Sequence, residues 1–462
     1  MKQIILFLND CVPKMVAIAI IFVIAILCLE WYRGWKDRHL KELKKGTRKK
    51  AHGIIFGKKG WKLVYSPEAS DGHVGVFSAS GTGKTSSIGI PTLRAWKGTS
   101  YTIDIAGDLC KNCPDMPHKL VYAPEKEDTT PYNIFAPIDD LDATEDKYEA
   151  LEQLAFLLMP EEPNMNDNAR FFLVNGRKIL TASFIGYYFQ GMDFIEIAEK
   201  IVESSWQELF RDIDNTENID AIRYINGFEG ANEANTAGCK QSCDDALKLF
   251  ATNGKIKRSI RRPKKGEKSV EPKKIEQNNI FVILGEEKLS LYAPLTNILT
   301  SQILSYISTR EVQKRSPAIL LFLDEYGSLK LDKELILDAV RRFRKRRCRI
   351  MVLMQNTVDL NLLYGADATR AILSNLKYKV LLGGLGEPES QKYFASLIGY
   401  KDSTKHSTSS NAKQTTRTES EAKEWVIEPA ELDRQGKDTV ILIAADEPDG
   451  YLKLKKNYYF KR

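Results

Sequence analysis

Residues 78–85, SASGTGKT, constrain the fold of this chain more than any other segment. They follow an apolar run, 74–78, that predicts a buried strand, and they open a helical pattern over 84–96. A strand, a glycine-rich loop and a helix in this order are typical of a P-loop, whose pattern is G-x4-GK[ST]. Ser78 stands at the first glycine position, so the pattern is broken once. The segment predicts a nucleotide-binding α/β domain built on a parallel sheet.

Each residue type in this loop has a chemical reason. Gly81 and Gly83 let backbone N–H groups wrap around phosphates, and the helix that follows adds its positive dipole. Lys84 is expected to reach the β- and γ-phosphates, and Thr85 to bind Mg²⁺. The predicted cofactors are therefore ATP and Mg²⁺. The predicted nucleotide-binding residues are Ser80, Gly81, Thr82, Gly83, Lys84, Thr85 and Ser86.

Two carboxylates follow a second apolar run in ILLFLDEY, 319–326. A buried strand that ends in two charges is costly unless the charges face a cation or water. We therefore expect Asp324 to bind Mg²⁺ beside Thr85, and Glu325 to polarise the attacking water. A strand-end pair held in a salt bridge is the alternative. Together with the P-loop, the pair predicts nucleotide hydrolysis, with Lys84 and Glu325 as catalytic residues.

Gln355 ends the next predicted strand, 350–354, on the same sheet edge. It is expected to sense the γ-phosphate or orient water, and the alternative is a cap for the following helix. Between the two strands lies RRFRKRRCR, 341–349, with seven basic residues. On a helix these side chains cannot all face one way. They are candidates for solvated charges, for DNA phosphate contacts, or for an arginine finger that reaches a neighbouring subunit.

Apolar runs at 100–105, 280–284, 319–323, 350–354, 380–382 and 439–444 predict further strands. From about 142 to 258 the apolar residues instead recur at helical spacing. We expect a nucleotide-binding domain in two parts, 51–141 and 259–462, with an all-α domain inserted at 142–258. A basic stretch, 255–274, is expected to be a solvated loop or linker, and DNA contact is the alternative. Residues 402–423 are rich in Ser, Thr and Lys and are expected to form a mobile loop.

The amino-terminal segment predicts a membrane anchor. Residues 15–29 are unbroken apolar, and 12–32 would span a bilayer if Lys14 and Glu30 snorkel outward. Residues 33–50 carry nine Lys/Arg against two acidic residues, which accounts for the net charge of +7. This places the bulk of the chain on the cytoplasmic side. The alternative is a secretory signal peptide, although no small-x-small cleavage site follows.

Seven irregularly spaced cysteines form no disulfide framework, as suits a reducing cytosol.

The ordered motifs resemble those of the coupling proteins of type IV secretion and conjugation, the TraG/TraD family of membrane-anchored ATPases. The resemblance starts at GIIFG, 53–57, and continues with SYTIDIAGDL, 100–109, in which Ala106 replaces the family's lysine. Further matches are PYNIF at 131–135, LDEYGSL at 323–329, LMQN at 353–356, LLYG at 362–365, ILSN at 372–375 and WVIEPAEL at 425–432.

The resemblance implies a RecA-like motor domain with a small all-α domain that recognises the substrate. It implies a homo-hexameric ring at the bacterial inner membrane. Such a ring recruits a relaxase bound to single-stranded DNA, or a protein effector, and passes it to the secretion channel. Arg344 falls where the family has its trans-acting arginine, with Arg342 and Arg346 close by.

Two other functions stay open on the sequence alone. The first is an FtsK- or HerA-like DNA translocase, against which the helical insertion and residues 425–432 argue. The second is a membrane docking platform that binds nucleotide but barely hydrolyses it, which Ser78 and Ala106 leave open. The paired Asp324 and Glu325 argue against a platform, because a scaffold has no need of a water-activating carboxylate.

Overall fold

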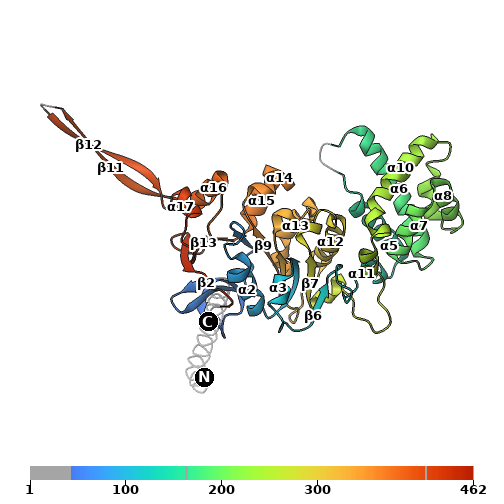
Figure 1. Cartoon of the computed structure of the whole chain (residues 1–462), viewed down its shortest axis with the longest axis horizontal. Coiled ribbons are helices and arrows are strands. Elements are labelled where there is room, and N and C mark those ends of the chain that lie inside the picture. Colours follow the sequence, from blue (N-terminus) through green and yellow to red (C-terminus); the bar gives the residue numbers. More distant parts are fainter. Residues whose placement is uncertain (1–25, 27–42, 162–164, 412–413, 461–462) are drawn as a thin grey trace, which may run out of the picture.

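The computed structural model describes residues 26, 43–161, 165–411 and 414–460 (Figure 1). The predicted anchor, 12–32, apart from one residue, and most of the basic run after it lie outside these ranges. Within the described ranges, no helix is both long and apolar enough to cross a bilayer.

One twelve-stranded sheet organises the described part of the chain, and seven neighbouring strands in it run parallel. In sheet order these are β10 (Tyr378–Leu381), β4 (Val74–Phe77), β9 (Cys348–Met354), β8 (Ile319–Leu323), β5 (Thr99–Ile105), β7 (Asn279–Leu284) and β6 (Lys119–Tyr122). An antiparallel edge continues from β10 through β13 (Thr439–Ala444), β14 (Tyr451–Lys455), β2 (Gly53–Lys59), β3 (Lys62–Pro67) and β1 (Lys44–Gly46).

The apolar runs form strands because a parallel sheet is buried on both faces. In β8, for example, all five residues of ILLFL are buried. Strands β1, β3, β6 and β14 are not predicted from the sequence. β6 has four residues, and β14 alternates apolar residues with lysine near the sheet edge, so neither gives a continuous apolar run.

Helices cover both faces of the sheet. On one face, Leu93 of α2 (Ile90–Ala95) and Leu109 of α3 (Asp108–Lys111) share a core with Val76 and Phe322. The helices on the other face include α12 (Ala293–Thr309), α13 (Lys333–Arg342), α14 (Val358–Tyr364), α15 (Ala366–Asn375) and α16 (Pro388–Ile398). The expected α/β fold with a mostly parallel sheet, the architecture of a RecA-like domain, is therefore confirmed.

A group of helices lies beside the sheet, at the right in Figure 1. It occupies the stretch expected to be helical and packs around Phe184, Phe194 and Phe250. Before it the chain forms α4 (Ala136–Asp139), and Tyr132 pairs with Ile260 and Val270, so the two connections lie together. The helices are α5 (Thr144–Leu158), α6 (Asp167–Tyr188), α7 (Phe194–Glu203), α8 (Trp206–Asp214), α9 (Ile219–Asn226), α10 (Glu233–Thr252) and α11 (Gly254–Ser259).

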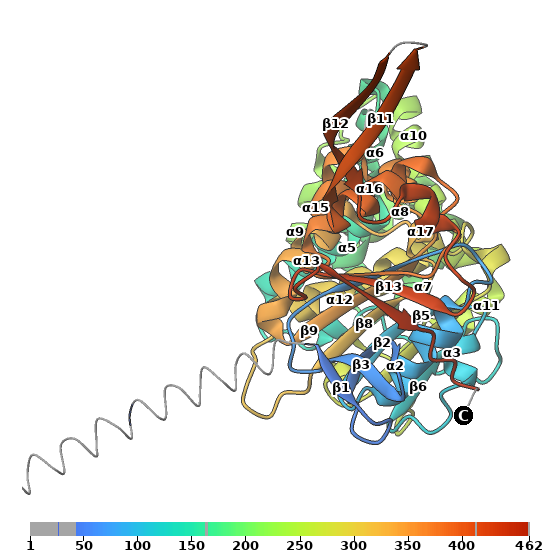
Figure 2. The same ribbon diagram turned by 90° about the vertical axis from the view of Figure 1, so that its left-hand side faces the viewer.

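The loop expected at 402–423 is wrong in its secondary structure. The chain there forms an antiparallel hairpin of β11 (Tyr400–Asn411) and β12 (Gln414–Trp425). The hairpin projects far from the body of the protein in both ribbon views (Figures 1 and 2). At its base the rings of Tyr400 and Trp425 stack with centroids 4.3 Å apart.

The helix expected for the basic run 341–349 is also wrong. α13 ends at Arg342, a short 3-10 turn covers Phe343–Arg346, and β9 already begins at Cys348. Arg349 therefore points into the sheet core, where its guanidinium donates to the carbonyl oxygens of Gly72 and Pro67. Its charge is structural and is not available to DNA or to a neighbouring subunit.

Candidate active site

The P-loop follows β4 at the carboxyl edge of the parallel strands. Gly81 and Gly83 have φ values of 74° and 100°, a left-handed conformation that favours glycine. A side chain at Gly83 would also meet the Tyr458 ring at 3.2 Å. The two glycines thus occupy positions where their lack of a side chain matters, as the loop pattern predicts.

Ser78 fits the loop despite the broken pattern. Within the described residues it is not among those with positive φ, so its backbone needs no glycine. Its side chain is buried, and its hydroxyl lies 2.5 Å from the Thr82 hydroxyl. The serine therefore closes the loop upon itself with an internal hydrogen bond.

Lys84 is buried at the centre of the loop and is 5% exposed. Its Nζ donates to the carbonyl oxygens of Ser78 at 2.7 Å and Ala79 at 3.3 Å. It also lies 3.9 Å from Oε1 of Glu325. Burial lowers the pKa of this lysine, and the nearby Glu325 and Asp324 oppose that effect. The ammonium group thus stands between the loop and the two carboxylates.

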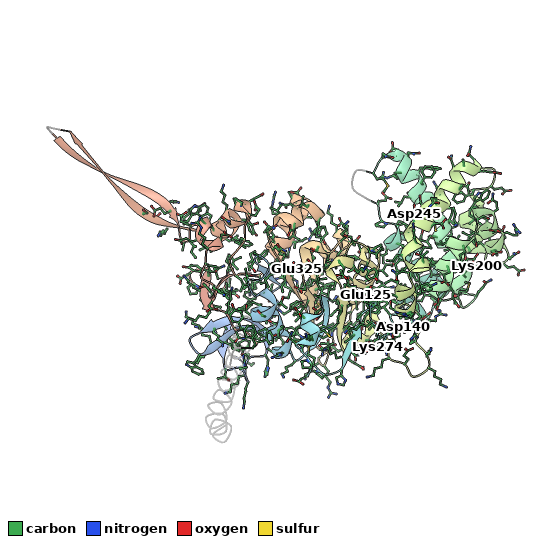
Figure 3. All side chains as sticks on the ribbon, in the orientation of Figure 1. Glu125, Asp140, Lys200, Asp245, Lys274 and Glu325 are labelled. Atoms are coloured by element: carbon green, nitrogen blue, oxygen red, sulfur yellow. The ribbon has the colours of Figure 1, made fainter. Side chains whose placement is uncertain are left out.

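Asp324 and Glu325 lie directly after β8, next to β9 and one strand away from β4. Burial, and then the charges of Glu325 and Asp104, raise the pKa of Asp324 to about 7. Glu325 has a φ of 45°, and its side chain is 30% exposed. Figure 3 places Glu325 in the part of the chain built on the large sheet, away from Lys200 and Asp245 of the helical group. One carboxylate is therefore buried and the other reaches solvent.

The donor set fits Mg²⁺. Hydroxyl and carboxylate oxygens such as those of Thr85 and Asp324 are the ligands that this hard cation prefers. The raised pKa of Asp324 marks a carboxylate that a nearby cation would return to its ionised form. Within the described ranges, no cluster of three or more His, Cys, Asp or Glu side chains is arranged to hold a metal. Mg²⁺ would therefore need further oxygens from phosphates and water, its usual partners in nucleotide sites.

Gln355 lies at the same sheet edge. It follows β9 directly, and the carbonyl oxygen of Met354 accepts a hydrogen bond from the Ser78 N–H group at 3.2 Å. Its side chain is exposed. The structure thus brings the loop, the carboxylates and Gln355 together on adjacent strand ends, as their order in the sequence suggested.

Arg344 is not part of this group. It lies in the turn before β9, at the opposite edge of the sheet from the P-loop, because β9 runs parallel to β4. It is exposed. The two other candidates for the trans-acting arginine already have partners within the chain. Arg342 forms an ion pair with Asp338 at 3.3 Å, and Nη1 of Arg346 donates to the carbonyl oxygen of Arg310.

Two residues that contact the loop, Lys456 and Tyr459, are not predicted from the sequence. Lys456 is buried, and its Nζ donates to the carbonyl oxygen of Thr82 at 2.7 Å. The Tyr459 N–H group donates to the carbonyl oxygen of Ser86 at 3.0 Å. No local motif could have revealed these contacts, because they join residues that lie more than 370 positions apart in the sequence. The charged and aromatic run KKNYYF, 455–460, is the sole local sign that this segment is unusual.

Comparisons with known proteins agree with this arrangement. The chain is 24% identical to the protein VirD4 of Rhizobium rhizogenes over 80% of its own length, and it spans about half (55%) of that relative. It superposes on the bacterial conjugative coupling protein TrwBdeltaN70 with a TM-score of 0.66 and 17% identity, covering 93% of this chain and 91% of that one. A structure of TrwB with the ATP analogue ADPNP gives a TM-score of 0.66 and 18% identity, with 93% and 92% covered.

These structural likenesses establish the fold, and the family follows from the sequence profile. The family described as Type IV secretory system Conjugative DNA transfer matches residues 33–462, which is nearly the whole chain. The predicted resemblance to type IV coupling proteins is thereby confirmed. The chain belongs to the conjugative DNA transfer family of type IV secretory systems.

Proposed function

We propose that this chain is an ATP-driven coupling protein of conjugative type IV secretion. It binds ATP with Mg²⁺, hydrolyses the nucleotide, and uses the energy to pass a substrate to the secretion channel. The observation that carries the proposal is the approach of Lys84 to Glu325, which joins a phosphate-binding loop to a second carboxylate. A platform that only bound nucleotide would not need that carboxylate, so its presence favours hydrolysis.

Each residue has a role in this proposal. Backbone N–H groups of 80–86 cradle the phosphates, and Lys84 exchanges its bonds to Ser78 and Ala79 for the β- and γ-phosphates. Thr85 and Asp324 hold Mg²⁺, which neutralises phosphate charge when bound. Glu325, exposed enough to meet solvent, orients the attacking water. Gln355, at the end of β9, contacts the γ-phosphate and so senses whether it is present.

Arg344 belongs to a neighbouring subunit's site in this account. Its place at the edge opposite the P-loop puts its own nucleotide out of reach, and its exposure leaves it accessible to a second copy. An arginine supplied in this way stabilises the charge that develops during phosphoryl transfer. We therefore propose a closed ring of identical subunits, and the resemblance sets the number at six.

The helical domain, 142–258, recognises the substrate in this proposal. It contains 21 Asp/Glu and 12 Lys/Arg, although the whole chain has an excess of basic residues. An acidic surface repels DNA phosphates and attracts basic polypeptide. This favours a protein partner for the domain: either a relaxase that carries single-stranded DNA or a protein effector. A plain DNA translocase has no use for such a domain.

The predicted anchor, 12–32, completes the proposal. It would hold the ring at the inner membrane as a single span, with the motor domain on the cytoplasmic side and near the secretion channel. The basic run after it would contact anionic headgroups.

ATP turnover by the full-length chain tests the proposal. We expect turnover that single-stranded DNA stimulates and that the Lys84→Ala substitution abolishes. Turnover that ignores DNA would point to a protein as the stimulating substrate. No turnover at high protein concentration, with ATP still bound, would contradict the motor and favour the docking platform.

A further inference from the structure

The segment after β14, Lys456–Phe460, docks on the P-loop at three successive points. Lys456 donates to the carbonyl oxygen of Thr82, and a further bond at 3.3 Å joins it to that of Leu382. The Tyr458 ring lies against Gly83. The Tyr459 N–H group donates to the carbonyl oxygen of Ser86. We call this stretch the docking segment.

The sequence of the P-loop helix explains the last contact. The helix begins with a π turn, Thr85–Gly89, in which the N–H group of Ile90 bonds to the carbonyl oxygen of Thr85. The next residue, Pro91, has no N–H group to give. The carbonyl oxygen of Ser86 is thus left without its partner in the helix, and Tyr459 supplies the missing donor.

The docking segment lies at one defined end of the phosphate site. Glu325 beside Lys84 marks the end where the γ-phosphate is cleaved. The loop backbone cradles the α- and β-phosphates, Lys84 reaches the β- and γ-phosphates, and Thr85, the first residue of the helix, is the Mg²⁺ ligand. We therefore infer that the α-phosphate lies beside Ser86, and that the ribose and base continue beyond it. Tyr459 is bonded at Ser86, so the docking segment borders the base end.

The docking segment carries three aromatic rings, those of Tyr458, Tyr459 and Phe460, and each ring packs against different neighbours. Tyr459 lies under the Arg94 guanidinium, 5.0 Å from its ring centroid. The Phe460 ring is 5.3 Å from that of Tyr458 at an angle of 32°, and 5.2 Å from that of Tyr459. Phe460 is 59% exposed, although it carries no polar atom to solvate. An open aromatic face beside a nucleotide site is suited to stacking on a base.

We propose that Tyr458 and Phe460 form a platform for the purine base of the nucleotide. Tyr458 is the fixed part, because it packs on Gly83, and Phe460 offers the free face. The platform rests on the proposed ATP binding and adds the residues that recognise the base.

Binding of ATP and of inorganic tripolyphosphate to the full-length chain separates base recognition from phosphate binding. In Phe460→Ala we expect the Kd for ATP to rise at least about fivefold, the low end of what stacking on an aromatic ring supplies. The Kd for tripolyphosphate should not change, because that ligand has no base. Phe460→Trp should restore ATP binding. Trp61→Ala is the matched control, since Trp61 is 74% exposed in the turn between β2 and β3.

The possible outcomes distinguish a failure of the base platform from a failure of the proposed ATP binding. An unchanged ATP Kd in both Phe460→Ala and Tyr458→Leu would overturn the platform while leaving the P-loop assignment intact. Equal weakening of ATP and tripolyphosphate would also overturn it, because the segment would then act on the shape of the loop. If the wild-type chain bound neither ligand, the proposed ATPase itself would fail, and the platform with it.

Discussion

The Nζ atom of Lys84 lies 3.9 Å from Oε1 of Glu325, although the two residues come from different β–α units. Their meeting follows from strand order: β4, β9 and β8 are neighbours, and all three run parallel. Whatever follows their carboxyl ends must share one edge of the sheet. The same order places Arg344, which precedes β9, at the other edge.

The position of Arg344 predicts complementation between two inactive variants. Arg344→Ala and Lys84→Ala should each lose ATP turnover, and a mixture should regain part of it. In a mixed ring, an intact P-loop meets an intact Arg344 from its neighbour. Arg342→Ala is the control, because that side chain is already paired with Asp338. Normal turnover in Arg344→Ala, or no recovery on mixing, would exclude it as the trans-acting residue.

The acidic helical domain predicts a loss of substrate binding without a loss of motor activity. Glu203, Asp214 and Glu229 are exposed there, and the described residues give them no ion pair. Changing all three to lysine should weaken binding of the relaxase, more so at low salt, and leave ATP turnover unchanged. Titration of relaxase onto the full-length chain at two salt concentrations measures this. Binding that is unaffected would move the recognition surface elsewhere.

The internal bond of Ser78 predicts a mild effect of restoring glycine to the loop. Ser78→Gly loses one hydrogen bond to Thr82, worth about 1 kcal/mol, so turnover should stay within about fivefold of wild type. Steady-state ATP hydrolysis is the readout. A change of a hundredfold in either direction would mean that the serine hydroxyl takes part in phosphate binding.

Buried His73 predicts a loss of stability in mild acid. Burial, and then the charges of Arg349 and Arg344, lower its pKa to about 3, and its Nδ1 accepts the N–H group of Ile350. The unfolded chain takes up a proton near pH 6.5 and the folded chain does not. Stability is therefore present above pH 6.5 and falls as the pH decreases, by about 1.4 kcal/mol between pH 7.5 and 5.5.

Urea unfolding at these two pH values, with His73→Gln beside wild type, isolates this contribution. The variant should be less stable at both, and its free energy of unfolding should depend less steeply on pH. An unaltered slope in His73→Gln would show that another group takes up the proton.

The sequence predicted those parts of the site that local patterns encode. β4 and β8 are continuous apolar runs, and the glycine-rich loop and the paired carboxylates follow them directly. The hairpin was missed because its Ser- and Thr-rich strands show no alternation of apolar and polar residues and therefore look like a loop. The change from helix to strand within 341–349 was missed because residue type alone does not show that α13 ends at Arg342 and β9 begins at Cys348.

The docking segment was missed for a different reason. Lys456 bonds to Thr82 across 374 residues of sequence, and neither residue carries a pattern that refers to the other. Such a contact depends on the antiparallel edge, where β14 pairs with β13 and delivers the segment to the loop. Only the assembled sheet places it.

Glu325→Gln gives the most direct test of the account, when ATP binding and ATP turnover are measured on the same full-length preparation. The change keeps the shape of the side chain and removes the negative charge that orients water. We predict wild-type affinity for ATP and a loss of turnover of at least about a hundredfold. Turnover that survives the substitution would contradict the assignment of Glu325 and the hydrolytic mechanism built on its contact with Lys84.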